Sequence, residues 1–172
     1  VGDRVVGSGT SGGYAEYTVS NCKGVFKIPK DVSFEVAASF PAVYLTSYLM
    51  IIHPGDLQPG ESILIHGAAG GVGLASIELA KIAGAKIIFG TCSPSKHEFI
   101  QERGVLPVDK DNFLAEIMQW TDEKGVDLVL DPIGGEHLMQ SYRCLGSGGR
   151  VCSFGISDMA PGKKRSHWHR IK

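Results

Sequence analysis

A glycine-rich segment at residues 66–73 (HGAAGGVG) most constrains what this chain can fold into. It follows an unbroken apolar stretch at residues 62–66 and precedes an apolar run that reaches Ala83, with Gly84 after it. Strand, glycine loop and helix in this order are typical of a dinucleotide-binding site, where the helix N-terminus and the exposed backbone receive a pyrophosphate. The segment therefore predicts a nucleotide-binding loop in an α/β fold.

The match to the fingerprint G-x-G-x-x-G is imperfect at one position. Aligned on Gly70 and Gly73, the first glycine of the motif is Ala68, which still permits a tight turn if its φ angle is negative. Gly70 is expected to let the pyrophosphate approach, and Gly73 to let the helix pack close to the strand. Because no Gly-Lys-Ser/Thr follows, the loop is not a P-loop for nucleoside triphosphates.

Strands and helices alternate along the rest of the chain. Apolar strands are expected at residues 62–66, 86–89, 106–108, 126–130 and 150–154. Besides the helix after the glycine loop, helices are expected at residues 94–103, 112–121 and 136–145. Unbroken apolar strands that alternate with helices indicate right-handed βαβ units. The predicted fold class is therefore α/β, a Rossmann doubly wound parallel sheet.

The N-terminal part of the chain differs in character. Short strands are expected at residues 3–7, 14–19 and 25–29, which are too few to bury a core by themselves. From Ser33, helical spacing predicts a helix that Pro41 breaks or kinks. The uncharged stretch at residues 36–55 is interpreted as a buried helix of this fold and not as a membrane span.

Composition and charge exclude several classes of protein. The 172 residues include 17 basic and 18 acidic side chains, so nothing in the net charge of −1 favours nucleic-acid binding. Four scattered cysteines lack zinc-site spacing, which indicates reduced thiols and a cytoplasmic location. The basic segment at residues 162–172 is either a solvated arm or the lining of a site for an anion.

The residues after the second strand of the α/β part indicate the type of cofactor. Ser93 lies about 20 residues beyond Gly73, where NAD-binding proteins usually carry an acid, and no acid appears before Glu98. Lys96 falls in the first turn of the next helix, where a cation is unfavourable unless an anion pairs with it. The pattern therefore favours NADP(H) over NAD(H). The alternative to a phosphate-binding role for Lys96 is that it is a solvated surface lysine.

Several short motifs then point to a family. In order, they are residues 2–5 (GDRV), 13–17 (GYAEY), 45–46 (LT), 66–73, 91–96 (TCSPSK), 131–135 (DPIGG), 149–151 (GRV) and 154–155 (FG). With them the chain resembles medium-chain dehydrogenases/reductases, in particular the zinc-independent quinone oxidoreductase branch with its zeta-crystallin-like and vesicle amine transport protein-like members. The resemblance implies that residues 1–33 are the last part of a truncated GroES-like domain. It makes residues 34–172 a Rossmann domain that lacks its last strand and helix.

The resemblance also implies a function and a set of site residues. It implies reduction of quinones or α,β-unsaturated carbonyls by hydride transfer from NADPH, in a parent protein that is a homodimer. The residues implied to contact the cofactor are Thr46 at the nicotinamide, Ala69, Gly70, Gly71, Val72 and Gly73 at the pyrophosphate, Ser93 and Lys96 at the 2′-phosphate, Asp131 near the ribose or the adenine, and Phe154, Gly155 and Ile156 beside the nicotinamide. Ala42 stands where zinc-dependent members have a cysteine ligand, so no catalytic zinc is expected.

The sequence identifies no catalytic residue. His66 is interpreted as a structural histidine, and Tyr44 and Tyr48 as core residues. Lys110 is either a second cation for the phosphate or a solvated side chain. Two other functions stay open: a cofactor-binding interaction or regulatory protein without turnover, and a methyltransferase-type Rossmann domain, which also expects an acid after the second strand.

Overall fold

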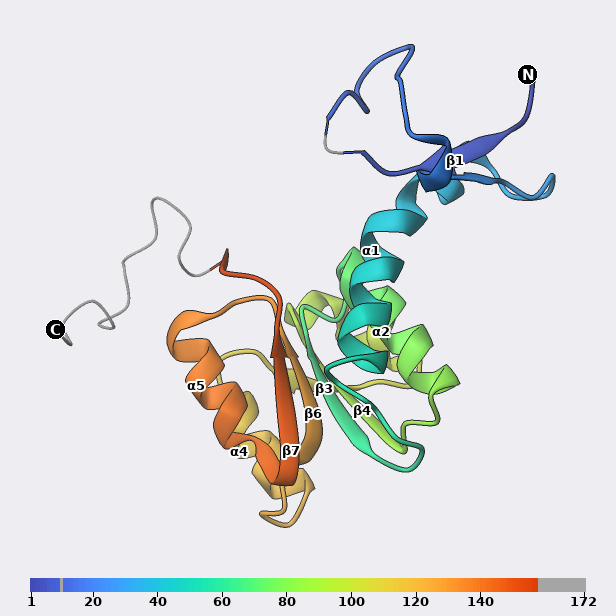
Figure 1. Cartoon of the computed structure of the whole chain (residues 1–172). Helices are drawn as coiled ribbons and strands as arrows, with labels where there is room; N and C mark the ends of the chain where they lie inside the picture. The colour runs from blue at the N-terminus through green and yellow to red at the C-terminus, as the bar shows by residue number, and fades with distance from the viewer. Residues whose placement is uncertain (10, 158–172) are drawn as a thin grey trace, which may run out of the picture. The chain divides into compact units, whose positions relative to one another are not determined.

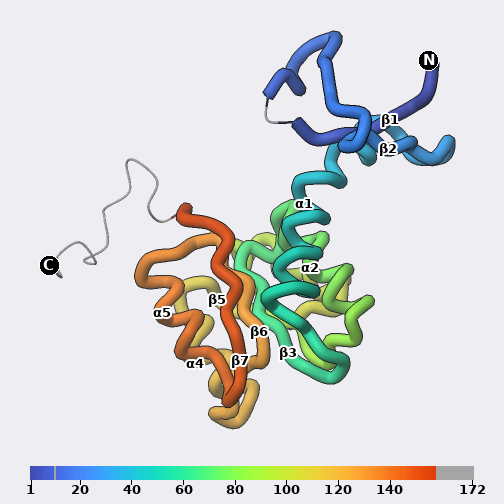
Figure 2. The backbone as a smooth tube through the Cα atoms, in the orientation of Figure 1, coloured from blue at the N-terminus to red at the C-terminus, as the bar shows by residue number. Residues whose placement is uncertain are grey.

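The chain forms two compact units in the computed structural model, which describes residues 1–9 and 11–157. The first unit is Val1–Thr46, and the second begins at Ser47 (Figure 1 and Figure 2). The expected domain boundary after residue 33, with the GroES-like assignment before it, remains a prediction. The basic segment at residues 162–172 lies outside the described residues, so both interpretations of it stay open.

The first unit contains a small antiparallel sheet. Its strands are β1 (Val5–Gly7) and β2 (Val25–Lys27), and a single 3-10 turn, η1 (Cys22–Gly24), precedes β2. The strand expected at residues 14–19 is wrong, because this segment is exposed and forms no strand. Its alternating pattern suits a strand, but no other described strand pairs with it to satisfy its backbone groups.

Helix α1 (Phe34–Ile52) runs across the boundary between the two units. It starts as predicted, since Ser33 Oγ accepts a hydrogen bond from the backbone N–H of Val36 at 3.2 Å. Pro41 lies inside the helix without ending it, so the break expected there is wrong. The helix continues although proline cannot donate the hydrogen bond of its turn.

Much of the apolar surface of α1 is exposed. Phe40, Leu45 and Tyr48 expose 54%, 57% and 46% of their surface, so the expected buried helix, and Tyr48 as a core residue, are wrong for the described chain. Of the helices in the described residues, α1 alone is long and apolar enough to cross a membrane. One such helix is weak support for a span, because helices of soluble proteins pass the same test of length and composition.

The second unit is built on a five-stranded parallel sheet, as predicted. Its strands are β3 (Ser62–His66), β4 (Ile87–Cys92), β5 (Leu106–Asp109), β6 (Val126–Asp131) and β7 (Leu145–Ser153). Their order in the sheet is β5-β4-β3-β6-β7, so the chain reverses direction across the sheet between β3 and β6. Ligands of open α/β sheets bind outside the carboxyl ends of the strands at such a reversal.

Helices cover both faces of this sheet (Figure 1). They are α2 (Gly71–Ile82), the 3-10 turn η2 (Pro94–Lys96) with α3 (His97–Gln101), α4 (Phe113–Trp120) and α5 (Gly135–Arg143). Ile63 and Ile65 of β3 face a core that includes side chains of α2 and α3, whereas Leu64 faces a second core that contains Phe113 of α4. The doubly wound arrangement is therefore confirmed.

Candidate functional site

The glycine loop joins β3 to α2 and is open to solvent. Gly67 makes the left-handed turn with a φ of +66°, and Gly67, Gly70 and Gly71 are exposed. Gly70 is the N-cap residue of α2 and no side chain caps the helix. The first N–H groups of a helix have no partner within it, so this N-terminus suits a phosphate group.

The two special positions of the motif behave as the sequence predicts. Ala68 is not among the residues with a positive φ, so the tight turn is made without its missing glycine. A Cβ atom on Gly73 would lie 2.6 Å from the carbonyl oxygen of Ala68 and would also overlap the carbonyl oxygen of Gly67. Close packing of α2 on the end of β3 therefore requires glycine at position 73.

Ser93 and Lys96 lie together after the carboxyl end of β4. Ser93 is the N-cap residue of η2 with Pro94 at the first helical position, as predicted, and its hydroxyl makes no capping hydrogen bond. The N–H of Lys96 donates to the carbonyl of Ser93 at 2.8 Å, and both side chains are exposed. By contrast, Lys110 forms a surface ion pair with Asp111 at 3.3 Å.

The ends of β6 and β7 are held against each other. The N–H of Phe154 donates to the carbonyl of Asp131 at 3.0 Å, and the N–H of Ser157 donates to the carbonyl of Pro132 at 3.4 Å. A Cβ atom on Gly155 would lie 2.8 Å from the carbonyl carbon of Pro132. Phe154 and Gly155 are half-buried, and Ile156, which follows them, is exposed.

Two predicted residues fall in the first unit. Thr46 is half-buried and is the last residue of that unit, so its expected place beside a nicotinamide remains a prediction. Ala42 is exposed on α1 and offers no ligand atom for a metal. The other predicted cofactor residues all follow the carboxyl ends of β3, β4, β6 and β7 or begin α2.

Asp131 is fully buried at the end of β6 and accepts four hydrogen bonds. Its Oδ1 accepts from the N–H groups of Ile133 at 2.7 Å and Gly134 at 2.9 Å. Its Oδ2 accepts from His137 Nδ1 at 3.0 Å and Ser141 Oγ at 2.7 Å. Burial by itself would raise the pKa of Asp131, but the hydrogen bonds, led by that of His137, lower its pKa well below the ordinary value.

His66 continues this network from the end of β3, and its side chain is 2% exposed. Its Nε2 lies 3.0 Å from Ser141 Oγ and its Nδ1 lies 3.1 Å from Thr91 Oγ1. Since the Ser141 hydroxyl donates to Asp131, it accepts from Nε2–H of His66, which leaves Nδ1 to accept from Thr91. Burial, together with the nearby His137, lowers the pKa of His66 to about 3, so its interpretation as a structural histidine is supported.

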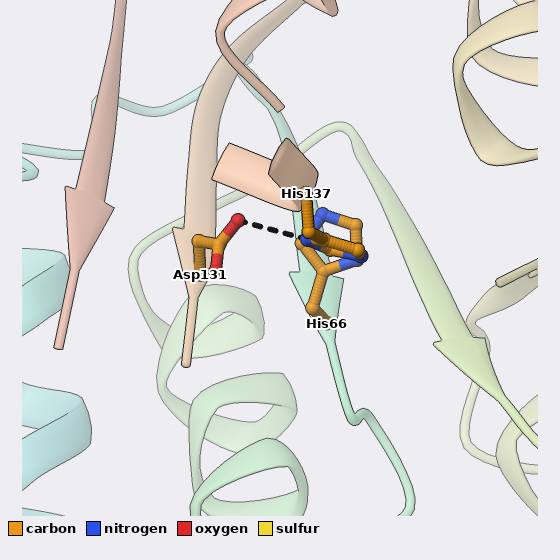
Figure 3. A group of neighbouring side chains, drawn as sticks. All are labelled: His66, Asp131 and His137. Carbon is orange, nitrogen blue, oxygen red and sulfur yellow. Dashed lines mark hydrogen bonds and ion pairs between the residues drawn. The ribbon is translucent and has the colours of Figure 1, made fainter. Parts of the chain in front are cut away.

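His66, Asp131 and His137 are also the types of side chain that bind a metal (Figure 3). Their ligand atoms lie within 4.8 Å of one another. Both nitrogens of His66 and both oxygens of Asp131 already make hydrogen bonds, whereas the buried Nε2 of His137 has no partner. Hydrogen bonds therefore account for every polar atom of these three side chains except Nε2 of His137.

The sequence analysis did not single out His137 and Ser141. They stand four residues apart in α5, so they share one face of a helix that begins just beyond Asp131. The spacing of four residues was the feature of the sequence that could have placed these two side chains together. Their contact with His66 was not readable, because Ser141 lies 75 positions away in the chain.

The low pKa of His66 predicts a pH dependence of stability. Its pKa in the folded chain is about 3 and its ordinary value is 6.5, so the unfolded chain takes up the proton first on acidification. Stability that is present above pH 6.5 is therefore lost as the pH falls toward 3. We expect the free energy of unfolding to drop by about 1 kcal/mol per pH unit below pH 6.5. The largest slope that the uptake of one proton can give is about 1.4 kcal/mol per pH unit.

Urea denaturation at several pH values between 7.5 and 5 measures this effect. In a His66→Gln variant the free energy of unfolding should depend less steeply on pH, whatever its value at neutral pH. Parallel pH dependences in the wild type and this variant would show that another group titrates.

Residues 71–169 match the family of zinc-binding dehydrogenases. The synaptic vesicle membrane protein VAT-1 homolog of Danio rerio is 39% identical over 168 residues, which are 96% of this chain and 35% of that protein. The chain spans between 35% and 48% of the length of its VAT-1 and quinone oxidoreductase relatives.

Solved structures share the fold. A quinone oxidoreductase from Pseudomonas syringae has a TM-score of 0.84 and 34% identity, with 91% of this chain and 49% of that chain covered. CurK enoyl reductase has a TM-score of 0.76 and 42% identity, with 79% and 42% covered. Mycobacterial Rv1454c in complex with NADPH has a TM-score of 0.83 and 30% identity, with 91% and 49% covered. The similar proteins thus include VAT-1 homologues, a quinone oxidoreductase and an enoyl reductase.

Proposed function

The chain belongs to the zinc-binding dehydrogenase family, and from this we propose that it is the NADP(H)-binding part of an oxidoreductase. The observation that carries the proposal is the exposed glycine loop, which begins α2 at the carboxyl edge of the parallel sheet next to the reversal between β3 and β6. Solved relatives include a quinone oxidoreductase and a structure in complex with NADPH.

The residues of the loop suit the pyrophosphate. Gly70 and Gly71 leave the backbone exposed, and the N–H groups of Gly71, Val72 and Gly73 belong to the first turn of α2. Ala69 precedes them in the loop. The Oγ of Ser47 donates to the carbonyl of Val72 at 3.0 Å, which holds the start of α2 in place.

The end of β4 suits the 2′-phosphate that distinguishes NADP(H) from NAD(H). Ser93 offers an exposed hydroxyl that makes no capping hydrogen bond, and Lys96 offers a cation in the same turn. Neither position carries the acid that would favour a free ribose 2′-hydroxyl. These two residues are therefore proposed to select NADP(H).

The nicotinamide end is assigned to Thr46 and to the segment Phe154, Gly155 and Ile156. A bound nicotinamide cofactor supplies hydride transfer, and the protein orients it and excludes water. No residue is assigned as the proton donor. Ala42 at the position of a zinc ligand supports reduction without a metal.

Quinones or α,β-unsaturated carbonyls are the proposed substrates. The support is that a quinone oxidoreductase and an enoyl reductase are among the similar structures. Both reactions deliver a hydride to a polarised, electron-poor double-bond system. The alternative is a protein that binds the cofactor in an interaction or regulatory role without turnover.

Cofactor binding and turnover by this chain test the proposal. Calorimetric titration should show saturable binding of NADPH that is tighter than that of NADH. NADPH oxidation should then be followed with a quinone and with an enone, with and without a chelator, for this chain and for a full-length relative, because the chain by itself is expected to turn over little. No saturable binding of either cofactor would overturn the proposal, NADPH binding by both proteins with oxidation by neither would favour the alternative, and activity lost to the chelator would contradict the zinc-free assignment.

A homodimer and a cytoplasmic location complete the proposal. Strand β7 is at one end of the described sheet, so its outer edge has unpaired backbone groups that a second copy could match. Three of the four cysteines are buried and none is in a disulfide, which agrees with a reducing compartment. Light scattering that gives only the monomer mass at high concentration would count against the dimer.

A further inference from the structure

We propose that Asp131 is a positioning residue for the nicotinamide half of the cofactor site, an inference that rests on the proposed function. The family resemblance implied direct contact of Asp131 with the cofactor near the ribose or the adenine. The carboxylate is fully buried and its two oxygens accept four hydrogen bonds, which is the full number of their lone pairs. It therefore acts through the turn that it holds.

That turn supports the segment after β7. Asp131 binds the N–H groups of Ile133 and Gly134, and Gly134 has a left-handed φ of +78°. The backbone of the same turn receives the N–H groups of Phe154 and Ser157, and it lies against Gly155. Release of the turn would therefore move the segment assigned to the nicotinamide.

The network also reaches the glycine loop. Ser141 links Asp131 to His66, and His66 contacts the hydroxyl of Thr91. The same hydroxyl accepts from the N–H of Gly67 at 3.3 Å. Asp131 is thus connected to the ends of β3 and β4 only through other side chains, whereas it binds directly the turn after β6 and two side chains of α5. The effect of changing it should be greatest on the nicotinamide side.

A metal site is the competing explanation of the same cluster. Metal binding through all three side chains would have to replace one of the four hydrogen bonds that Asp131 accepts and one of those made by His66, whereas Nε2 of His137 has no hydrogen bond to lose. Because hydrogen bonds already occupy both nitrogens of His66 and both oxygens of Asp131, we favour the positioning role for Asp131. Zinc binding is one of the outcomes that the test distinguishes.

The test compares NADPH with adenosine 2′,5′-bisphosphate, which carries the 2′-phosphate but no nicotinamide. In an Asp131→Asn variant the single amide oxygen can accept either from the two N–H groups of the turn or from His137 and Ser141, and the NH2 group then faces the other pair of donors. Calorimetry should show NADPH affinity reduced about tenfold, the equivalent of one impaired buried hydrogen bond. Affinity for the bisphosphate should stay within about twofold of the wild type.

Asp127→Asn is the matched control. Asp127 is in β6 as well, but it accepts from the N–H and hydroxyl of Ser62 at 2.7 Å, near the opposite end of the strand. This variant should bind both compounds as the wild type does. If Asp131→Asn does not fold, Ser141→Ala serves instead, because it removes one of the hydrogen bonds that orient the carboxylate toward the turn, and a smaller loss confined to NADPH is expected.

Four outcomes would overturn the inference. Equal losses for NADPH and the bisphosphate would make Asp131 merely structural, and unchanged binding would give it no role. Stoichiometric Zn²⁺ binding by the wild type that His137→Gln abolishes would establish a metal site instead. Absence of NADPH binding in the wild type would overturn the proposed function itself, and the inference with it.

Discussion

Replacement of Gly73 by alanine is expected to lower the free energy of unfolding by about 3 kcal/mol, at the upper end for overpacking. The added Cβ would lie 2.6 Å from the oxygen and 2.7 Å from the carbon of the Ala68 carbonyl. Both atoms belong to the backbone of a tight turn, so neither can move without opening the loop. Alanine is the better helix former by about 1 kcal/mol, and the overlap outweighs that gain.

Urea denaturation of this variant and of two other glycine variants measures the effect. Gly24→Ala is the matched control, because a Cβ there has no heavy atom within 4 Å, and its midpoint should barely change. Gly70→Ala places a Cβ 3.2 Å from the Gly67 oxygen at an exposed position. This variant should have a clear loss of NADPH affinity and only a small decrease in the free energy of unfolding. An unchanged midpoint for Gly73→Ala would show that α2 does not need the close approach.

The second unit could be predicted well because its three central strands, β4, β3 and β6, are buried on both sides. Strand β3 has its expected bounds, residues 62–66, since an unbroken apolar run between polar turns has few other solutions. Strand β7 begins earlier than expected, at Leu145. It was expected to start only at Arg150, but a Cβ on Gly149 would lie 2.9 Å from the Val126 oxygen, so glycine there permits close pairing with β6.

The first unit was predicted less well for a different physical reason. Helical spacing predicts that α1 forms, but it does not say which surface covers the apolar side chains. Phe40 and Leu45 are accordingly helical and exposed. The alternation at residues 14–19 likewise suits a strand, yet strand formation depends on a neighbouring strand to pair with, and no described strand does so.

At the candidate site, local features were predictable and long-range ones were not. The turn of Ser93 and Pro94, the negative φ of Ala68 and the packing role of Gly73 all follow from neighbouring residues. The network around Asp131 joins β6 and α5, which follow each other in the chain, to β3 and β4, which are distant from them in sequence. Only the folded sheet brings its hydrogen-bonding groups together.

Changes at the end of β4 are expected to move cofactor preference from NADPH toward NADH. If Lys96 pairs with the 2′-phosphate, Lys96→Ala should weaken NADPH binding by roughly 1.5–3 kcal/mol, about 10- to 100-fold. NADH binding should hardly change, because NADH has no phosphate there. Ser93→Asp should act more strongly, since it sets a negative charge against the phosphate and offers the 2′-hydroxyl of NADH an acceptor.

Calorimetric titration of both cofactors against the wild type, the two single variants and their combination checks this prediction. Lys86→Ala is the control, because Lys86 is an exposed lysine just before β4, at the opposite edge of the sheet. It should leave both affinities unchanged. Equal losses of NADPH and NADH affinity in Lys96→Ala would give this lysine a structural role. A preference for NADP(H) would then depend only on the absence of an acid at position 93.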